Sequence, residues 1–159
     1  MYRYAKKTAL WTAAAFVFAA CACACAGAPP FSDVMNKDWN LAEVRIKPEN
    51  IIIERGKLAE EGFGDIFTLR FDAERVNGIG APNRYFAPYT LADKRGITVK
   101  TVAQTLMIAI REPEQFKEKD FFAYLQNAAQ WNIVKGNLEL FSKGEDGAEA
   151  VLVFTPAGK

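Results

Sequence analysis

Residues 67–72 read Phe-Thr-Leu-Arg-Phe-Asp, and this short stretch decides the fold class. Large apolar side chains alternate with polar ones at every second position, which is the period of a β-strand with one buried face. A helix would instead need apolar residues three or four positions apart. The stretch therefore predicts a sheet, with Phe67, Leu69 and Phe71 pointing into a core.

Other short segments with β-type patterns lie on both sides of this strand, and turn residues separate them. They fall within residues 39–46, 50–55, 85–91, 97–101, 131–134, 138–141 and 151–154, with a further apolar run at 105–110. The period changes to three and four around Phe121, Phe122 and Leu125, which predicts an amphipathic helix over residues 114–129. About seven or eight strands with one main helix predict an α+β domain, built as a curved antiparallel sheet or open β-barrel. The residues expected to be buried are Phe67, Leu69, Phe71, Phe122, Leu125, Trp131, Leu138, Leu140 and Val153.

Composition excludes several classes of function. The chain has 159 residues, with 20 Lys+Arg, 19 Asp+Glu, no His and a formal charge of +1. This length predicts one domain, and the near-neutral charge offers no basic stripe for nucleic acid. The absence of His removes the commonest general base and metal ligand, and all three cysteines lie before residue 26. We therefore expect no catalytic residue, no metal and no cofactor.

The first thirty residues differ from the rest of the chain. Residues 1–8 contain three basic residues and no acid, residues 9–20 are apolar or small without a charge, and residues 21–28 are small. This order is typical of a secretory signal peptide, and twelve such residues are too few for a membrane span of about 20. Removing residues 1–20 leaves 17 of the 20 basic residues against 19 acids, a formal side-chain charge of −2.

The end of this segment, Phe18-Ala19-Ala20-Cys21, resembles the lipobox of bacterial lipoproteins, in which the cysteine is acylated and becomes the new N-terminus. We therefore predict lipidation of Cys21. Two other interpretations stay open. Ordinary cleavage after Ala24 or Ala26 would give a periplasmic or secreted protein, and the Cys-x-Cys-x-Cys pattern could form a cytosolic metal or redox cluster, although it lacks a fourth ligand.

Lipidation at Cys21 divides the chain into a signal peptide (1–20), a tether (21–36) and a folded domain (37–159). The first expected partner is then a membrane, contacted through the lipid anchor. Ala22 follows the lipidated cysteine, whereas many lipoproteins retained in the inner membrane carry an acid there. The outer membrane is therefore the favoured location in the cell envelope.

Several motifs follow one another in the domain. It opens with Trp39-Asn40-Leu41, continues with Phe-x4-Val-x-Gly-x-Gly over residues 71–80, and then carries Asn83-Arg84-Tyr85 and Tyr89. Thr-Leu-Met at 105–107 and a Glu–helix–hairpin ending complete the order. Over about residues 38–155 this order resembles the META domain, the family of the bacterial heat-shock protein HslJ.

The resemblance implies a barrel-like α+β envelope domain, often exported or on a lipoprotein, with no known enzymatic activity and a role linked to stress. The chain departs from the family where Ala81-Pro82 and Ala109 stand in place of two cysteines, and where Leu106 replaces an arginine. Whatever the two cysteines do in other members, this protein does without it.

Asn83, Arg84, Tyr85 and Tyr89 are the candidate ligand-binding residues, at the mouth of the expected barrel. The alternative is that Asn83 supplies turn hydrogen bonds while Tyr85 packs inward. The neighbouring Gly78-x-Gly80 lacks the third glycine and the helix of a phosphate-binding loop, so we expect a tight loop between strands.

Two functions follow from these observations. The preferred one is a non-catalytic module of a membrane-anchored lipoprotein that binds or supports another envelope component, either an envelope protein or a small apolar ligand, through an apolar cavity or an exposed sheet edge. The alternative is an envelope hydrolase with two carboxylates about 5–9 Å apart across a cleft. Its candidate acids are Glu60/Glu61, Glu112/Glu114 and Glu145/Asp146.

Overall fold

A computed structural model describes residues 29–144 and 146–158 of this protein. The expected signal peptide and its cleavage site, with Cys21, Cys23 and Cys25, lie outside these residues, as does Glu145. No helix among the described residues is long and apolar enough to cross a membrane. The elements are η1 (Phe31–Asp33), β1 (Asp38–Ile46), β2 (Asn50–Ile52), α1 (Arg55–Glu60), β3 (Thr68–Phe71), β4 (Arg75–Ile79), β5 (Arg84–Ala92), β6 (Gly96–Val99), β7 (Ala103–Gln104), α2 (Glu118–Gln126), β8 (Gln130–Val134), β9 (Asn137–Lys143) and β10 (Glu149–Pro156).

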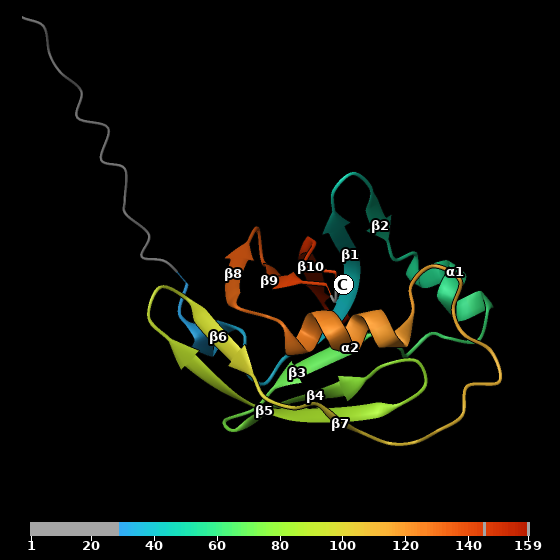
Figure 1. The fold of residues 1–159 in the computed structure, drawn as a ribbon, viewed down its shortest axis with the longest axis horizontal. Coiled ribbons are helices and arrows are strands. Elements are labelled where there is room, and N and C mark those ends of the chain that lie inside the picture. The colour runs from blue at the N-terminus through green and yellow to red at the C-terminus, as the bar shows by residue number, and fades with distance from the viewer. Residues whose placement is uncertain (1–28, 145, 159) are drawn as a thin grey trace, which may run out of the picture.

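Eight strands close into an antiparallel barrel in the order β1, β3, β4, β5, β6, β8, β9 and β10, with β10 pairing back onto β1 (Figure 1). The remaining two strands lie off this ring, since β2 pairs with β1 and β7 pairs with β5. The main helix α2 packs against β6 and β9 and buries Phe121 and Leu125. The predicted α+β class with one main helix is confirmed, and the barrel is closed.

The stretch at 67–72 behaves as its period predicts, because Phe67, Leu69 and Phe71 are all buried. β3 nevertheless begins only at Thr68, since Phe67 has a left-handed φ of 51°. The amide of Phe67 donates to the carbonyl of Gly80, and its own carbonyl accepts from the amide of Leu41. This bend joins the start of β3 to β1 on one side and to the end of β4 on the other.

The structure confirms most of the other residues expected in the core and corrects one of them. Leu125, Trp131, Leu138 and Leu140 are buried in one continuous apolar cluster, as predicted. Phe122 is only partly buried and packs against the edge of that cluster, which corrects the prediction for this residue.

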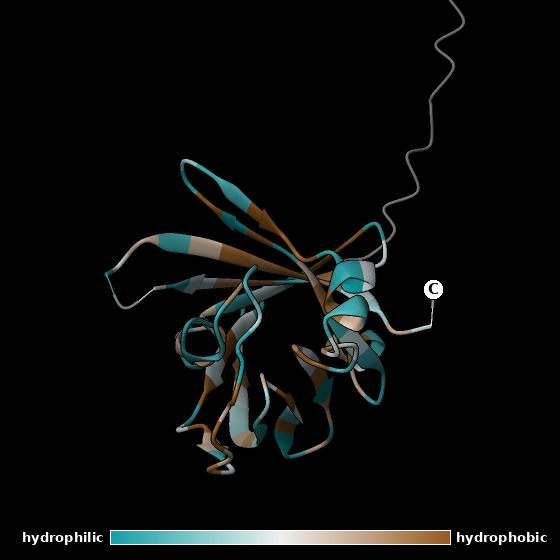
Figure 2. Cartoon of the chain, turned by 90° about the vertical axis from the view of Figure 1, so that its right-hand side faces the viewer, coloured by the Kyte–Doolittle hydropathy of each residue, from teal (hydrophilic) through white to brown (hydrophobic). Residues whose placement is uncertain are grey.

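Apolar residues concentrate in the strands, while several hairpin tips are polar (Figure 2).

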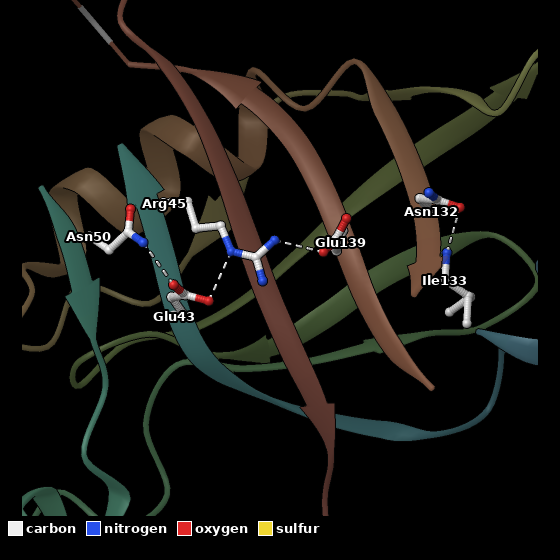
Figure 3. A network of polar contacts seen from close by, with 6 residues as sticks. All are labelled: Glu43, Arg45, Asn50, Asn132, Ile133 and Glu139. Atoms are coloured by element: carbon white, nitrogen blue, oxygen red, sulfur yellow. Dashed lines mark hydrogen bonds and ion pairs between the residues drawn. The ribbon is translucent and has the colours of Figure 1, made fainter. Parts of the chain in front are cut away.

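Val153 is buried as predicted, but it lies outside the core cluster. On β10 it pairs with Glu43 of β1 on one side and with Glu139 of β9 on the other. The guanidinium of Arg45 bridges both carboxylates, at 2.9 Å from Glu43 and 2.8 Å from Glu139, while Asn50 donates to Glu43 at 3.1 Å (Figure 3). Hydrogen bonding to Glu139 raises the pKa of Arg45.

The main helix is shorter at both ends than the predicted span of residues 114–129. It begins after Lys117, whose backbone is extended, because the chain before it places Phe116 in the core against Phe67. It ends at Gln126 because the amide of Ala129 donates to the carbonyl of Phe141 and so joins the sheet.

The folded part begins earlier than the expected Lys37. Phe31 and Val34, which fall in the predicted tether, are 8% and 0% exposed. The Phe31 ring contacts Phe71 and Trp131 edge to face, and the indole of Trp39 donates to the carbonyl of Val34. Burial of these two apolar residues makes η1 part of the domain, so any tether ends before Phe31.

Three local predictions also need correction. The strand expected at residues 50–55 ends at Ile52, and residues 55–60 form the short helix α1. Gly78 lies inside β4, so the tight loop between strands covers only residues 80–83. The apolar run at 105–110 contains no strand and is largely exposed.

Candidate functional site

Asn83 lies at the end of the loop between β4 and β5 and is 6% exposed. Its side-chain oxygen accepts from the hydroxyl of Thr105 and from the amide of Met107, both at 2.8 Å. Its side-chain nitrogen donates to Glu118 at 2.7 Å. Both ends of the Asn83 amide are therefore used inside the fold, where they join three segments that are distant in sequence.

Glu118 completes this junction from the first turn of α2. One carboxylate oxygen accepts from the backbone amides of Ala81, at 2.5 Å, and Asn83, at 2.7 Å, and the other accepts from the Asn83 side chain. Its position at a helix N-terminus also favours the negative charge. No motif in the sequence indicates a role for Glu118, although an acid at the start of the predicted helix is a weak signal for one.

The two glycines before this junction are required by close approach. A Cβ at Gly78 would lie 2.1 Å from the carbonyl oxygen of Thr68 and 2.9 Å from the Tyr85 hydroxyl. A Cβ at Gly80 would lie 2.5 Å from a Glu118 oxygen. The Gly-x-Gly pattern therefore leaves room for a phenol and a carboxylate of the same chain, and does not form a phosphate cradle.

The two candidate tyrosines also have internal partners. The Tyr85 hydroxyl crosses over Gly78 and donates to the carbonyl of Thr68 at 2.9 Å, while the Tyr89 hydroxyl donates to the carbonyl of Asp72 at 2.7 Å. Burial raises the pKa of both phenols above the ordinary value. Neither group is an available acid or base near neutral pH.

As the pH rises from about 8 to about 11, we expect the free energy of unfolding to fall less for a Tyr85→Phe variant than for the wild type. Burial raises the pKa of Tyr85 from its ordinary value of 10.0, so its contribution is complete below that pH and is lost as the pH rises towards the folded pKa. Near neutral pH the variant loses only the hydrogen bond to Thr68, roughly 1 kcal/mol. Urea midpoints of both proteins at about pH 8 and about pH 11 measure the difference. An equal change of midpoint with pH in the two proteins would contradict the prediction.

Arg84 is the one candidate residue whose side chain points to solvent. Its backbone pairs with Thr105, and its side chain has no hydrogen bond or ion pair among the described residues. It borders an open depression of about 660 Å³ on the outer face of β4 and β5, beside Ile79 and Phe86. Tyr85 borders the same depression, whereas Asn83 and Tyr89 do not, so the four candidates do not line one cavity together.

The most exposed apolar side chains follow β7, in residues 106–110, called here the aliphatic segment. Leu106, Ile108 and Ile110 are 91%, 92% and 98% exposed, and Met107 is 58% exposed. The exposure follows every second residue, and none of residues 105–110 has a positive φ or lies in a helix or strand. Contiguous exposed apolar surface is a feature of interaction sites, so the aliphatic segment is a candidate binding surface.

Two of the acids proposed for a hydrolase have lysine partners in the described part of the chain. Glu112 is ion-paired with Lys117 at 3.2 Å, and Glu61 lies 3.9 Å from Lys57. Glu112 and Glu118 border the same polar depression beside α2, where Glu118 is held by three hydrogen bonds. Residues 29–144 and 146–158 contain no group of three or more acids or cysteines arranged to hold a metal.

Comparison with solved structures shows that the fold occurs elsewhere. The NMR structure of a protein from Burkholderia xenovorans matches with a TM-score of 0.59 and 14% identity, over all of both chains. The crystal structure of a DUF4847 family protein from Bacteroides vulgatus matches with a TM-score of 0.51 and 15% identity, over 79% of this chain and 95% of the other. At these identities the likeness concerns the fold alone.

No curated protein matches this chain. The family model of the META domain matches residues 32–158, which is most of the chain and nearly all of its described part. This match starts one residue after the buried Phe31 and ends after β10, so it covers the whole barrel. The chain therefore belongs to the META domain family.

Proposed function

We propose that this protein is an envelope lipoprotein, held to a membrane through an acylated Cys21, whose META domain is a non-catalytic module that binds or supports another envelope component. The observation that carries the binding role is the aliphatic segment. Exposing three large aliphatic side chains to water is unfavourable unless they contact something else. A role in stress, which the family resemblance implies, is part of this proposal.

Contacts with the folded domain at both ends of the aliphatic segment support a binding role. At one end, Thr105 and Met107 are hydrogen-bonded to the buried Asn83. At the other end, Arg111 donates to the carbonyl of Glu61 and lies over the ring of Phe63, 5.4 Å from its centre. A surface that is fixed at both ends loses little conformational entropy when it binds.

The alternative, a hydrolase with paired carboxylates, has weaker support, because the two carboxylates that border one depression, Glu112 and Glu118, are both engaged by other groups. Its candidate acids at 61 and 112 are ion-paired on the surface, and Glu118 has a structural role. The candidate polar groups of Asn83, Tyr85 and Tyr89 are likewise engaged within the fold.

A photo-crosslinking amino acid at position 108, in intact cells, tests the binding role. We expect it to capture an envelope component, because Ile108 is 92% exposed in the centre of the aliphatic segment. The same amino acid at Ile52, 56% exposed on β2, is the matched control. Equal capture at the two positions, or none, would show that the segment is not a binding surface.

Mass spectrometry of the mature N-terminus tests the anchor separately. We expect a chain that starts at Cys21 and carries a diacylglyceryl group, since two or more acyl chains anchor a protein stably. An unmodified chain that starts at Cys25 or Gly27 would contradict lipidation and indicate a periplasmic or secreted protein.

A further inference from the structure

Two arginines without acidic partners bracket the aliphatic segment. Arg84 lies beside its start, where the Arg84 carbonyl accepts from the amide of Thr105. Arg111 follows its end, donates to the Glu61 carbonyl and lies over the Phe63 ring. Neither arginine is ion-paired within the described ranges, whereas the nearby Glu112 is neutralised by Lys117. The local surface thus combines exposed aliphatic side chains with two arginines that have no ion pair among the described residues, while Asp72 and Glu74 border the depression beside Arg84.

We propose that the aliphatic segment is a second membrane contact, in which Leu106, Ile108 and Ile110 enter the interface of an anionic phospholipid layer. Arg84 and Arg111 then lie at the depth of the headgroup phosphates. This inference rests on the proposed function and names the envelope component that the segment binds. Aliphatic side chains next to arginines are the combination that lets a surface element reside in a membrane interface.

The size of the surface favours lipid over a protein partner. A stable protein interface covers roughly 800 Å² on each side and about 20–30 residues. The aliphatic segment offers three side chains that each project almost fully into solvent, with Met107 half exposed. A membrane needs no complementary shape, so separate projecting side chains are sufficient to contact it.

The position of the N-terminus sets the orientation that this contact requires. The described chain begins beside β6 at one end of the long axis, while the chain after β7 runs along the opposite end (Figure 1). If the anchor is at Cys21, residues 22–28 reach at most about 25 Å. A domain of this size has a radius of gyration of about 14 Å. The tether therefore permits both contacts when the long axis lies along the membrane.

Binding to vesicles tests the contact without the anchor. The core residues of the described part lie between Phe31 and Phe154, so we expect a chain of residues 21–159 with Cys21→Ser to keep the fold. We expect it to bind vesicles of phosphatidylethanolamine with phosphatidylglycerol, and to bind phosphatidylcholine vesicles more weakly. Replacing Leu106, Ile108 and Ile110 with Ser should weaken binding by about tenfold or more. Arg84→Gln should reduce both the affinity and its dependence on salt.

Matched control variants distinguish this contact from nonspecific hydrophobic binding to vesicles. Ile52→Ser and Leu91→Ser remove aliphatic side chains that are 56% and 45% exposed elsewhere on the barrel, and both should bind like the wild type. Equal binding by the triple variant, or no binding by the wild type, would overturn the proposal. So would a concentration-dependent dimer that the triple variant loses, because the segment would then be a protein interface.

Fluorescence of the full-length protein, processed in cells, tests the orientation. An Ile108→Trp variant should be quenched by brominated phospholipids and an Ile52→Trp variant should not, since the native Trp39 and Trp131 are 2% and 6% exposed. Quenching only at position 108 supports the second contact whether or not Cys21 is acylated. An acylated protein without this quenching would retain the anchor and overturn the second contact, so the two failures are distinguishable.

Discussion

Replacing Gly78 with alanine is expected to destabilise the domain by about 4 kcal/mol. The added Cβ would lie 2.1 Å from the Thr68 carbonyl oxygen, a backbone atom that pairing within the barrel prevents from moving away. It would also lie 2.9 Å from the Tyr85 hydroxyl and break the hydrogen bond to Thr68. Overpacking of this kind costs roughly 1–3 kcal/mol or more, and the lost hydrogen bond adds about 1 kcal/mol. Urea unfolding followed by tryptophan fluorescence measures the loss.

Gly56→Ala is the matched control for this substitution. Gly56 lies inside α1, has no positive φ and has no heavy atom within 4 Å of an added Cβ. Alanine there should leave stability unchanged or raise it by about 0.5–1 kcal/mol, because glycine is the poorer helix former. Similar effects of the two substitutions would contradict the close packing of Tyr85 and Thr68 around Gly78.

Replacing Glu118 with alanine is expected to cost about 3 kcal/mol. It leaves the backbone amides of Ala81 and Asn83 without their acceptor, while the Asn83 side-chain nitrogen keeps its longer hydrogen bond of 3.4 Å to the Met107 carbonyl. Each buried donor without a partner costs about 1–3 kcal/mol, and partial access of water to this junction limits the sum. Glu118→Gln should have an intermediate effect, since its amide oxygen still accepts from the backbone while its amide nitrogen faces a donor.

Glu112→Ala is the control for the charge change. The ion pair of Glu112 with Lys117 has about half of each side chain exposed, so its loss should cost less than about 0.5 kcal/mol. Thermal unfolding of the three variants ranks them. A Glu118→Ala protein as stable as Glu112→Ala would show that the junction around Asn83 does not hold α2 to the barrel.

Local pattern was sufficient to predict the class of fold. Alternation at 67–71 identified the inward face of β3, because successive side chains of a strand point to opposite sides whatever the strand pairs with. The apolar repeat around Phe121 and Leu125 identified the main helix for the corresponding reason. The order of motifs pointed to the family, and the family model matches residues 32–158.

The candidate site was predicted less well, because its chemistry depends on contacts between distant segments. Asn83 and Tyr85 were identified as notable, but their partners Glu118, Met107 and Thr68 lie 35, 24 and 17 residues away in the chain. Nothing in the local pattern indicates that a helix carboxylate meets a loop amide. The internal role of these residues could be recognised only after the barrel had brought them together.

Periodicity shows which side of an element is apolar, but hydrogen-bonding edges are alike in all strands, so it does not show which strands pair. The pairing of β10 with β1 joins the last strand in the sequence to the first, and it depends on the packing of the whole core. The same limit applies to residues 105–110, where composition alone suggests a buried strand. In the folded domain β5 already pairs with β4, β6 and β7, so that apolar run remains on the surface. Sequence therefore established the composition of each element, and tertiary packing decided which elements meet and which apolar residues stay exposed.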